Sequence, residues 1–193
     1  MKICLSLMIL VTLNLLIAQE VDLPECEWCG ANEAPENLSW KTVIPDENEP
    51  GETLIITGTV YMVDGRTPAQ NIILYVYHTN SEGIYPKKGT ETGNGRRHGY
   101  LRSWIRTDEN GQYQITTIKP GSYPTRTEPA HIHMTIKEPE KAEYWIDSII
   151  FEGDPLITER YKSRLKKLGG SGITRLTFDN AIWRGERNII LED

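Results

Sequence analysis

A tyrosine followed eight residues later by two histidines is the clearest chemical signal in this chain. Tyr123 precedes the sequence Pro-Ala-His-Ile-His, in which His131 and His133 stand two residues apart. On a β-strand that spacing sends both imidazoles to the same face of the sheet. Two imidazoles that converge beside a phenol predict a metal site. A second phenol, Tyr85, lies upstream in Ser-Glu-Gly-Ile-Tyr-Pro and is the fourth candidate ligand.

The combination of two phenols and two imidazoles favours one kind of metal. Phenolate is a hard anionic donor that suits a hard trivalent ion, whereas zinc sites prefer thiolate, imidazole and carboxylate. The set therefore predicts ferric iron. A zinc hydrolase is an alternative, but it needs a carboxylate base, and Glu128 is the only candidate close to the histidines in the sequence. His78 and His98 are expected to be structural or to contact the ligands.

The length and charge of the chain limit the number of domains and the kinds of partner that it can have. Its 193 residues are enough for one domain with a substantial core, and the formal net charge is −6. No long basic block stands out, which argues against a nucleic-acid partner. The nearest approach to a basic patch is formed by Arg96, Arg97, Arg102 and Arg106. These arginines could belong to a solvated face, or one of them could attract an anionic aromatic substrate.

The N-terminus has the features of a secretory signal. Lys2 is the only charged residue before Glu20, and residues 3–17 are almost wholly apolar but too few to span a bilayer comfortably. Ala18 offers a small residue for cleavage. Residues 1–18 are therefore predicted to be a signal peptide and the protein to be exported, secreted or periplasmic, with an uncleaved anchor as the alternative. No later segment is apolar enough to cross a membrane.

Two cysteines stand close together near the start of the predicted mature chain. Cys4 would leave with the signal, so Cys26 and Cys29 remain, in the sequence Cys-Glu-Trp-Cys. In an exported protein this pair is predicted to form a short local disulfide. A thioredoxin-like redox site is disfavoured because no βαβ pattern follows, and a zinc half-site lacks a second cysteine pair.

The order of strand signals predicts an all-β fold. Residues 19–50 have little periodicity and are expected to form an extended arm, tied onto the domain or partly disordered. Residues 51–193 form the predicted catalytic domain, with one helix over 158–168 that Gly169 and Gly170 end. Many short strands separated by turns predict an antiparallel β-sandwich with long loops and one short helix. Strands are expected over residues 54–62, 71–78, 101–106, 112–117, 130–137, 145–151, 173–178 and 187–191.

A long loop follows the second predicted strand and carries Tyr85. It runs from about residue 80 to residue 99 and contains five glycines, too many for regular structure. Loops of this length in compact domains are usually functional or mobile.

These segments resemble the intradiol ring-cleavage dioxygenases, the class that includes catechol 1,2-dioxygenase and protocatechuate 3,4-dioxygenase. The similarity covers roughly residues 52–157. The sequence Val-Tyr-His-Thr-Asn-Ser-Glu-Gly-Ile-Tyr ending at Tyr85 resembles the family segment that ends in its first tyrosine ligand, and residues 107–123 resemble the run that leads to its second. Residues 129–133 resemble the histidine motif, and residues 151–156 resemble a downstream element of the fold.

The resemblance implies a mononuclear ferric site and a ring-opening reaction. By position, Tyr85, Tyr123, His131 and His133 would bind the iron. A catechol-type diol would displace Tyr123, whose freed phenolate helps to take up a substrate proton. Dioxygen would then open the ring between the two hydroxylated carbons to give a muconate-type diacid, with no organic cofactor. The chain is similar to a minimal, exported branch of the family.

The chain departs from the family pattern beside the histidines. Glu128 stands directly before Pro-Ala-His, where the family usually has an arginine that steadies charge on the substrate ring. Arg126 is therefore expected to be a catalytic and substrate-binding residue, and Arg97 a substrate-binding one. The main alternative function is a non-catalytic transthyretin-like β-sandwich module that has lost iron or activity. Such modules require neither Tyr85 nor a His-x-His pair.

Overall fold

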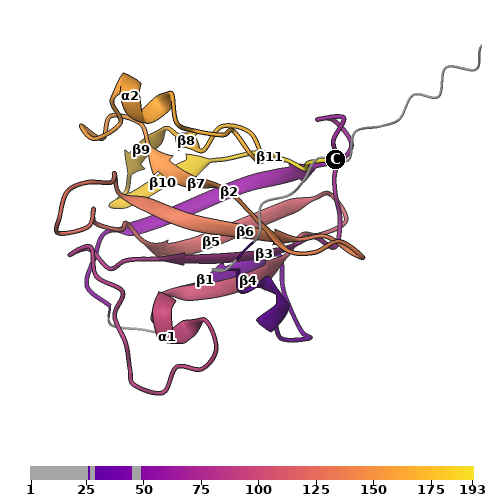
Figure 1. The fold of residues 1–193 in the computed structure, drawn as a ribbon, viewed down its shortest axis with the longest axis horizontal. Helices are drawn as coiled ribbons and strands as arrows, with labels where there is room; N and C mark the ends of the chain where they lie inside the picture. The colour runs from indigo at the N-terminus through magenta and orange to yellow at the C-terminus, as the bar shows by residue number, and fades with distance from the viewer. Residues whose placement is uncertain (1–25, 27–28, 45–48) are drawn as a thin grey trace, which may run out of the picture.

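The computed structural model of the protein describes residues 26, 29–44 and 49–193. Two β-sheets pack face to face in this part of the chain, which confirms the predicted all-β sandwich (Figure 1). The predicted signal peptide, residues 1–18, lies outside the described residues. None of the helices that the structure describes is long and apolar enough to cross a membrane.

The first sheet is built around β2 and β5, an antiparallel pair. Its strand order is β1-β5-β2-β10-β9, and β11 also pairs with β2. Both β10 and β11 run parallel to β2, and β1 runs parallel to β5, so the sheet is mixed rather than wholly antiparallel. Its strands are β1 (Lys41–Val43), β2 (Thr53–Tyr61), β5 (Gln112–Ile118), β9 (Leu176–Asp179), β10 (Ile182–Glu186) and β11 (Ile189–Ile190).

The second sheet carries the predicted ligands. Its order is β4-β3-β6-β7-β8, antiparallel except for the parallel pair β7 and β8. In this order β6, which contains both histidines of the motif, lies at the centre. The strands are β3 (Ile73–His78), β4 (Arg102–Arg106), β6 (His131–Lys137), β7 (Tyr144–Phe151) and β8 (Ile173–Thr174).

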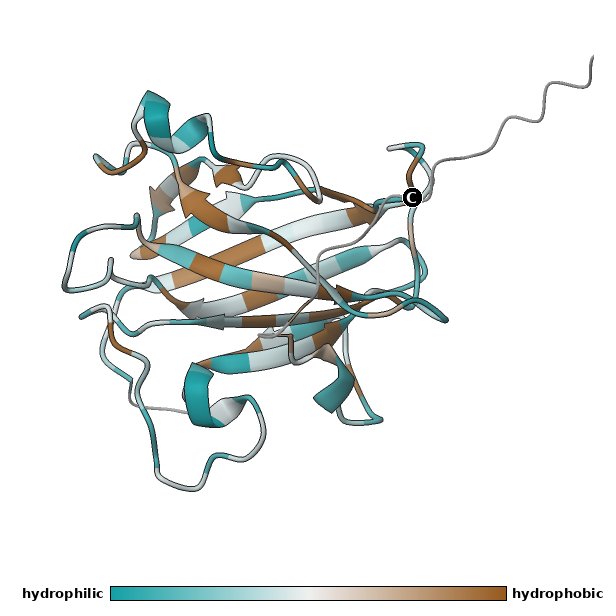
Figure 2. Ribbon diagram, viewed as in Figure 1, coloured by the Kyte–Doolittle hydropathy of each residue, from teal (hydrophilic) through white to brown (hydrophobic). Residues whose placement is uncertain are grey.

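The second sheet has two chemically different faces, because successive strand residues point to opposite sides. Figure 2 shows the alternation of hydrophobic and hydrophilic residues along the strands. On β6, the residues that alternate with the core side chains are His131, His133 and Thr135, which face away from the first sheet. We call this side the outer face. The inner-face side chains of β3 and β6 enter the core between the sheets: Leu74, Val76, Ile132, Met134 and Ile136.

Residues 39–43 of the predicted N-terminal arm join the two sheets. β1 pairs with β5 of the first sheet, and the backbone carbonyl of Ser39 accepts a hydrogen bond from Arg106 N of the second at 3.1 Å. The hydroxyls of Thr42 and Ser103 also lie 2.6 Å apart. These contacts fix the end of the arm across one edge of the sandwich.

The predicted helix over 158–168 is much shorter in the structure. Only one turn forms, α2 (Glu159–Lys162), with the Thr158 side chain accepting a hydrogen bond from Tyr161 N at its start. Beyond it, Lys167 adopts a left-handed φ of 60° and its N–H donates to the Asp147 carboxylate at 2.9 Å. Hydrogen bonds to β7 thus replace those that would continue the helix, and the prediction was wrong for residues 163–168.

Four elements were not predicted from the sequence, and the first of them is the strand β1 in the arm. β10 follows a turn in which Asn180 and Ala181 both have positive φ, at 48° and 60°, so the hairpin lacks the glycine that usually marks such turns. The long loop contains the single helical turn α1 (Gly95–His98). A short 3-10 helix, η1 (Ala31–Glu33), lies in the arm.

Candidate metal centre and cavity

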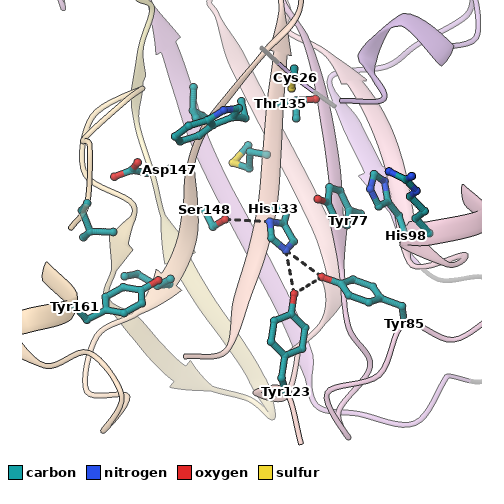
Figure 3. Close-up of a pocket in the computed structure, with 16 residues that line it drawn as sticks. Cys26, Tyr77, Tyr85, His98, Tyr123, His133, Thr135, Asp147, Ser148 and Tyr161 are labelled. Atoms are coloured by element: carbon teal, nitrogen blue, oxygen red, sulfur yellow. Dashed lines mark hydrogen bonds between the residues drawn. The ribbon is translucent and has the colours of Figure 1, made fainter. Parts of the chain in front are cut away.

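The four predicted ligands come from two loops and one strand, and they meet at one point. Tyr85 Oη lies 2.7 Å from Tyr123 Oη and 3.0 Å from His133 Nε2. Tyr123 Oη lies 3.2 Å from His131 Nε2 and 3.3 Å from His133 Nε2. The two Nε2 atoms are 2.8 Å apart. Figure 3 shows Tyr85, Tyr123 and His133 turned towards one another.

The spacing of these donor atoms fits a shared metal ion. Two ligands about 2 Å from one ion lie about 2.8 Å apart at a right angle and about 3.3 Å apart at a tetrahedral angle. The distances observed run from 2.7 to 3.3 Å. The described residues contain no group of three or more His, Cys, Asp or Glu side chains that could hold a metal. The donor set itself, two phenols and two imidazoles, suits a hard trivalent ion better than zinc, which prefers thiolate, imidazole and carboxylate.

A β-bulge in the pairing of β6 with β7 lies directly beside His133. The register shifts between Ile132 and Met134, so that Asp147 and Ser148 both stand opposite His133. Such bulges are common next to active sites, where they re-aim side chains. Here the bulge brings Ser148 Oγ to 3.4 Å from His133 Nδ1 and places both bulge residues in the wall of the cavity described below.

The two tyrosine-bearing loops touch through glycine. A β-carbon on Gly83 would overlap the backbone carbonyl of Ser122, and one on Gly121 would overlap the carbonyl of Ser81. Gly121 N also donates to the Asn80 carbonyl at 2.9 Å. Glycine at both positions therefore lets the loops approach closely enough for the two phenols to meet.

The histidines have the protonation state that a metal requires. His131 Nδ1 lies 2.7 Å from the Pro129 carbonyl, which can only accept, so Nδ1 carries the proton and Nε2 presents its lone pair. Burial lowers the pKa of His131 and holds the pKa of His133 well below its usual value. Both rings are therefore neutral near pH 7.

The two tyrosines, unlike the histidines, are not in the protonation state that binds a metal when no cation is present. Burial raises the pKa of Tyr85 and of Tyr123, and the nearby Glu128 carboxylate further raises that of Tyr123. Without a cation both phenols stay protonated near neutral pH. A bound trivalent ion reverses this balance, because it stabilises the phenolate form of each ligand.

The two predicted substrate-binding arginines lie in different places. Arg97, in α1, lines the same cavity as Tyr85, Tyr123 and His133. Arg126 is exposed in a turn after Tyr123, with a φ of 50°, and is not among the residues that line the cavity. The structure thus brings Arg97, but not Arg126, to the cavity wall.

The other two histidines differ in their relation to the donors. His78 is fully buried on the inner face, where Nε2 lies 2.7 Å from Thr117 Oγ1 of the opposite sheet, so its contacts are structural. His98 stacks on Tyr77 with 3.6 Å between ring centroids, and Tyr77 in turn stacks on His133 at 4.4 Å. His98 thus supports the ring of a candidate ligand through Tyr77.

A cavity of about 640 Å³ opens beside the donors on the outer face. The sequence analysis missed most of its wall, because nothing in the chain order shows that β7, α2 and the cysteine segment border the same space. Tyr77 had a recoverable signal, since it alternates with core residues on β3 and so must share a face with the histidines of β6. The wall residues missed from the sequence include Tyr77, Thr135, Trp145, Asp147, Ser148 and Tyr161.

A disulfide joins Cys26 and Cys29 at the edge of this cavity. The segment that follows is fixed to the outer face. Trp104 Nε1 donates to the Gly30 carbonyl at 2.6 Å, and Ala31 N donates to the Glu143 carboxylate at 2.7 Å. The arm therefore contributes to the cavity wall as well as to the sheets.

Comparisons with known proteins identify relatives of this chain. A family model described as Dioxygenase matches residues 31–169. Catechol 1,2-dioxygenase of Acinetobacter baylyi is 34% identical over 116 residues, which cover 52% of this chain and 36% of the relative. The protocatechuate 3,4-dioxygenase beta chain of Burkholderia cepacia is 28% identical over 123 residues, covering 61% and 52%. The chain thus spans about a third to a half of the length of these relatives.

A solved structure shares the fold. The dioxygenase domain of a dioxygenase carbohydrate-binding protein fusion from Streptomyces sp. SirexAA-E aligns with a TM-score of 0.61 at 20% identity, covering 82% of this chain and 91% of that domain. At this identity the likeness concerns the fold alone. The family model, by contrast, matches most of the chain, including the segments that carry all four donors. The chain belongs to the intradiol ring-cleavage dioxygenase family.

Proposed function

We propose that this protein binds one ferric ion and uses dioxygen to open a catechol-type ring between its two hydroxylated carbons, giving a muconate-type diacid. The observation that carries the proposal is the meeting of Tyr85, Tyr123, His131 and His133 at mutual distances that fit one ion. A transthyretin-like binding module has no need of such a cluster. Family membership supports the reaction class.

In this proposal the four side chains hold the metal, and one of them, Tyr123, also accepts a proton from the substrate. When bound, ferric iron would draw electron density from the diol and so activate the ring towards dioxygen. Tyr85 and His133 both pack against the ring of Tyr77, and His133 also contacts Ser148 of β7. Tyr123 lies on a loop next to an exposed turn, which makes it the ligand best placed to move aside and accept a proton from the diol.

The carboxylate of Glu128 has a specific consequence for this step. It stands where the family usually has an arginine, and it raises the pKa of Tyr123. A freed Tyr123 oxygen is then a stronger base than it would be beside an arginine. We propose that Arg97, which lines the cavity, supplies the positive charge near the substrate, and that Arg126 contributes less.

The activity is tested with protein reconstituted with one equivalent of ferric iron. Oxygen uptake with catechol, measured together with the ring-opened diacid by chromatography, should show one dioxygen consumed for each ring opened. A reconstituted protein that holds iron but consumes no oxygen with any catechol tried would contradict the proposal and favour the binding-module alternative. Arg97→Ala and Arg126→Ala variants, assayed side by side, would separate the two arginines.

We also propose that the protein is exported after cleavage near Ala18. The apolar run before Ala18 and the disulfide at the cavity edge support this, because disulfides persist in oxidising compartments. N-terminal sequencing of the protein recovered outside the cytoplasm should begin near residue 19. A protein retained in the cytoplasm with Met1 intact would contradict export.

A further inference from the structure

Tyr77 lies beside the four donors but is not one of them. It stands on β3 directly opposite His133 of β6, so the two side chains are neighbours on the outer face. Tyr77 lines the same cavity as Tyr85, Tyr123 and His133. A ligand that enters the cavity to reach these donors therefore passes into the space that Tyr77 borders.

The ring of Tyr77 is held between two imidazoles. The His98 ring stacks on it with 3.6 Å between centroids and 7° between planes, and the His133 ring stacks on it at 4.4 Å and 15°. Figure 3 shows Tyr77 between these two histidines. The ring cannot tilt without breaking one of the stacks, so the position of its hydroxyl is fixed before any ligand arrives. Such preorganised donors are what substrate-binding sites use.

The hydroxyl of Tyr77 has no partner in the part of the chain that the structure describes. Because the oxygen is unpaired and yet is not one of the unpaired atoms sealed from water, it remains accessible from the cavity. Figure 3 shows it directed into the cavity rather than towards His98. Tyr77 as a whole is only 7% exposed. Polar groups in such positions are usually hydrogen-bonded, so a ligand in the cavity is the natural partner.

Tyr75 shows what a structural tyrosine on the same strand looks like. It lies two residues before Tyr77 on β3 and therefore points to the same face. Its hydroxyl lies 2.8 Å from His98 Nδ1, and the residue is fully buried and does not line the cavity. The protein thus satisfies the hydroxyl of Tyr75 and leaves that of Tyr77 open to a ligand.

The chemistry of a catechol supplies an acceptor for this hydroxyl. When the diol loses its protons its oxygens become anionic, and anionic oxygens accept strong hydrogen bonds. A phenol that is not a metal ligand keeps its proton at neutral pH and can donate it in a hydrogen bond. Tyr77 is therefore suited to donate to the diol, whereas Tyr123 is suited to accept a proton from it.

We propose that Tyr77 is a further substrate-binding residue, whose hydroxyl donates a hydrogen bond to an oxygen of the deprotonated diol. The inference rests on the proposed function of the same site and adds a contact that holds the substrate. Tyr77 keeps its proton and does not bind the iron. Because its ring is fixed by the two stacks, the bond also sets the direction from which the diol approaches the donors.

The test removes the hydroxyl and keeps the ring. Dissociation constants for catechol are measured by calorimetry under nitrogen, so that binding is read without turnover, on the ferric wild type, Tyr77→Phe and the matched control Tyr75→Phe. Tyr77→Phe should bind catechol about 10- to 100-fold more weakly, the value of a hydrogen bond to a charged group. Its iron content, and its visible spectrum before catechol is added, should match those of the wild type. Tyr75→Phe should bind catechol as tightly as the wild type does.

The outcomes separate this contact from damage to the site. A Tyr77→Phe protein that bound catechol as tightly as the wild type would overturn the inference while leaving the proposed function intact. Loss of iron from Tyr77→Phe would also overturn it, because the hydroxyl would then serve the metal site. An equal weakening in Tyr75→Phe would overturn it too, because packing of the wall would be the cause. If the wild type neither bound nor consumed oxygen with any catechol, the proposed function would fail, and this inference with it.

Discussion

Histidines lie on both faces of the second sheet, but their surroundings differ. On the inner face, His78 is sealed in the core and hydrogen-bonded to Thr117 of the opposite sheet. On the outer face, His131 and His133 direct their Nε2 atoms at each other and at two phenols. The inner histidine has its hydrogen bonds satisfied by protein, whereas the outer pair crowds lone pairs into one spot. Donors that meet in this way predict a ligand site, whereas a histidine whose hydrogen bonds are made within the protein is expected to be structural.

The largest effect is expected when a tyrosine among the predicted ligands is replaced. Tyr85→Phe on the ligand side should lower iron content and reduce activity by more than about 100-fold, since even residues that only orient a metal ligand are worth 10- to 100-fold. Metal analysis and oxygen uptake measure both effects.

Tyr113→Phe, on β5 of the first sheet, is the matched control in the core between the sheets. Tyr113 is buried in the core and its hydroxyl donates to the Arg187 carbonyl at 2.8 Å. Its loss should lower the free energy of unfolding by about 1 kcal/mol, with iron content and activity unchanged. Iron loss in Tyr113→Phe but not in Tyr85→Phe would contradict the assignment of Tyr85 as a ligand and of Tyr113 as a structural residue.

A substitution in the core should have the opposite effect to Tyr85→Phe: it should lower stability and leave iron binding intact. Ile132 lies between His131 and His133 on β6 but points into the core and is fully buried. Ile132→Ala should lower the free energy of unfolding by about 2–5 kcal/mol, measured by urea denaturation of the metal-free protein. The folded fraction should still bind iron in a one-to-one ratio. A stable Ile132→Ala protein that lost its iron would show that the two faces are not separable.

The inner histidine predicts a loss of stability in acid. Burial lowers the pKa of His78 to about 4, below the value of about 6.5 expected in the unfolded chain. The unfolded chain therefore takes up this proton first as the pH falls. The resulting stability is fully present above pH ~6.5 and is lost as the pH falls towards ~4, by at most about 3 kcal/mol.

Urea denaturation of the metal-free protein across that range measures the slope. A His78→Asn variant is the control, because it removes the titrating group and should be less stable at pH 7 but flatter below pH ~6.5. If the wild type and this variant lost stability in parallel, His78 would not be the group that responds to acid.

The smallest effect is expected at the β7 bulge. Ser148 Oγ is 3.4 Å from His133 Nδ1, a long contact that orients the ring only weakly. Ser148→Ala should weaken iron binding by less than about 10-fold, at the lower end of the range for residues that orient a ligand. Competition with a chelator measures this affinity. A loss as large as that of Tyr85→Phe would mean that Ser148 is part of the site itself.

The sequence allowed the donors to be predicted but not the space around them. Period-two spacing placed His131 and His133 on one face, and β-branched runs bounded by turns located most strands of the sandwich. The cavity wall depends on the bulge at Asp147 and Ser148, which is a matter of register between two strands and leaves no local pattern. The helix after Thr158 was overestimated for a related reason, since Asp147 binds the backbone of Lys167 from another element. Hydrogen bonds between residues far apart in the sequence therefore determine the cavity wall and the end of this helix, and local sequence patterns do not reveal them.

The visible absorption spectrum of the ferric-reconstituted protein, before and after addition of a catechol under nitrogen, tests the central claim most directly. If Tyr85 and Tyr123 bind the ion as phenolates, the protein should show a charge-transfer band that colours it red-brown, and catechol should shift that band. A protein that takes up one equivalent of ferric iron but stays colourless would contradict the account, because its iron would not be bound by the two tyrosines.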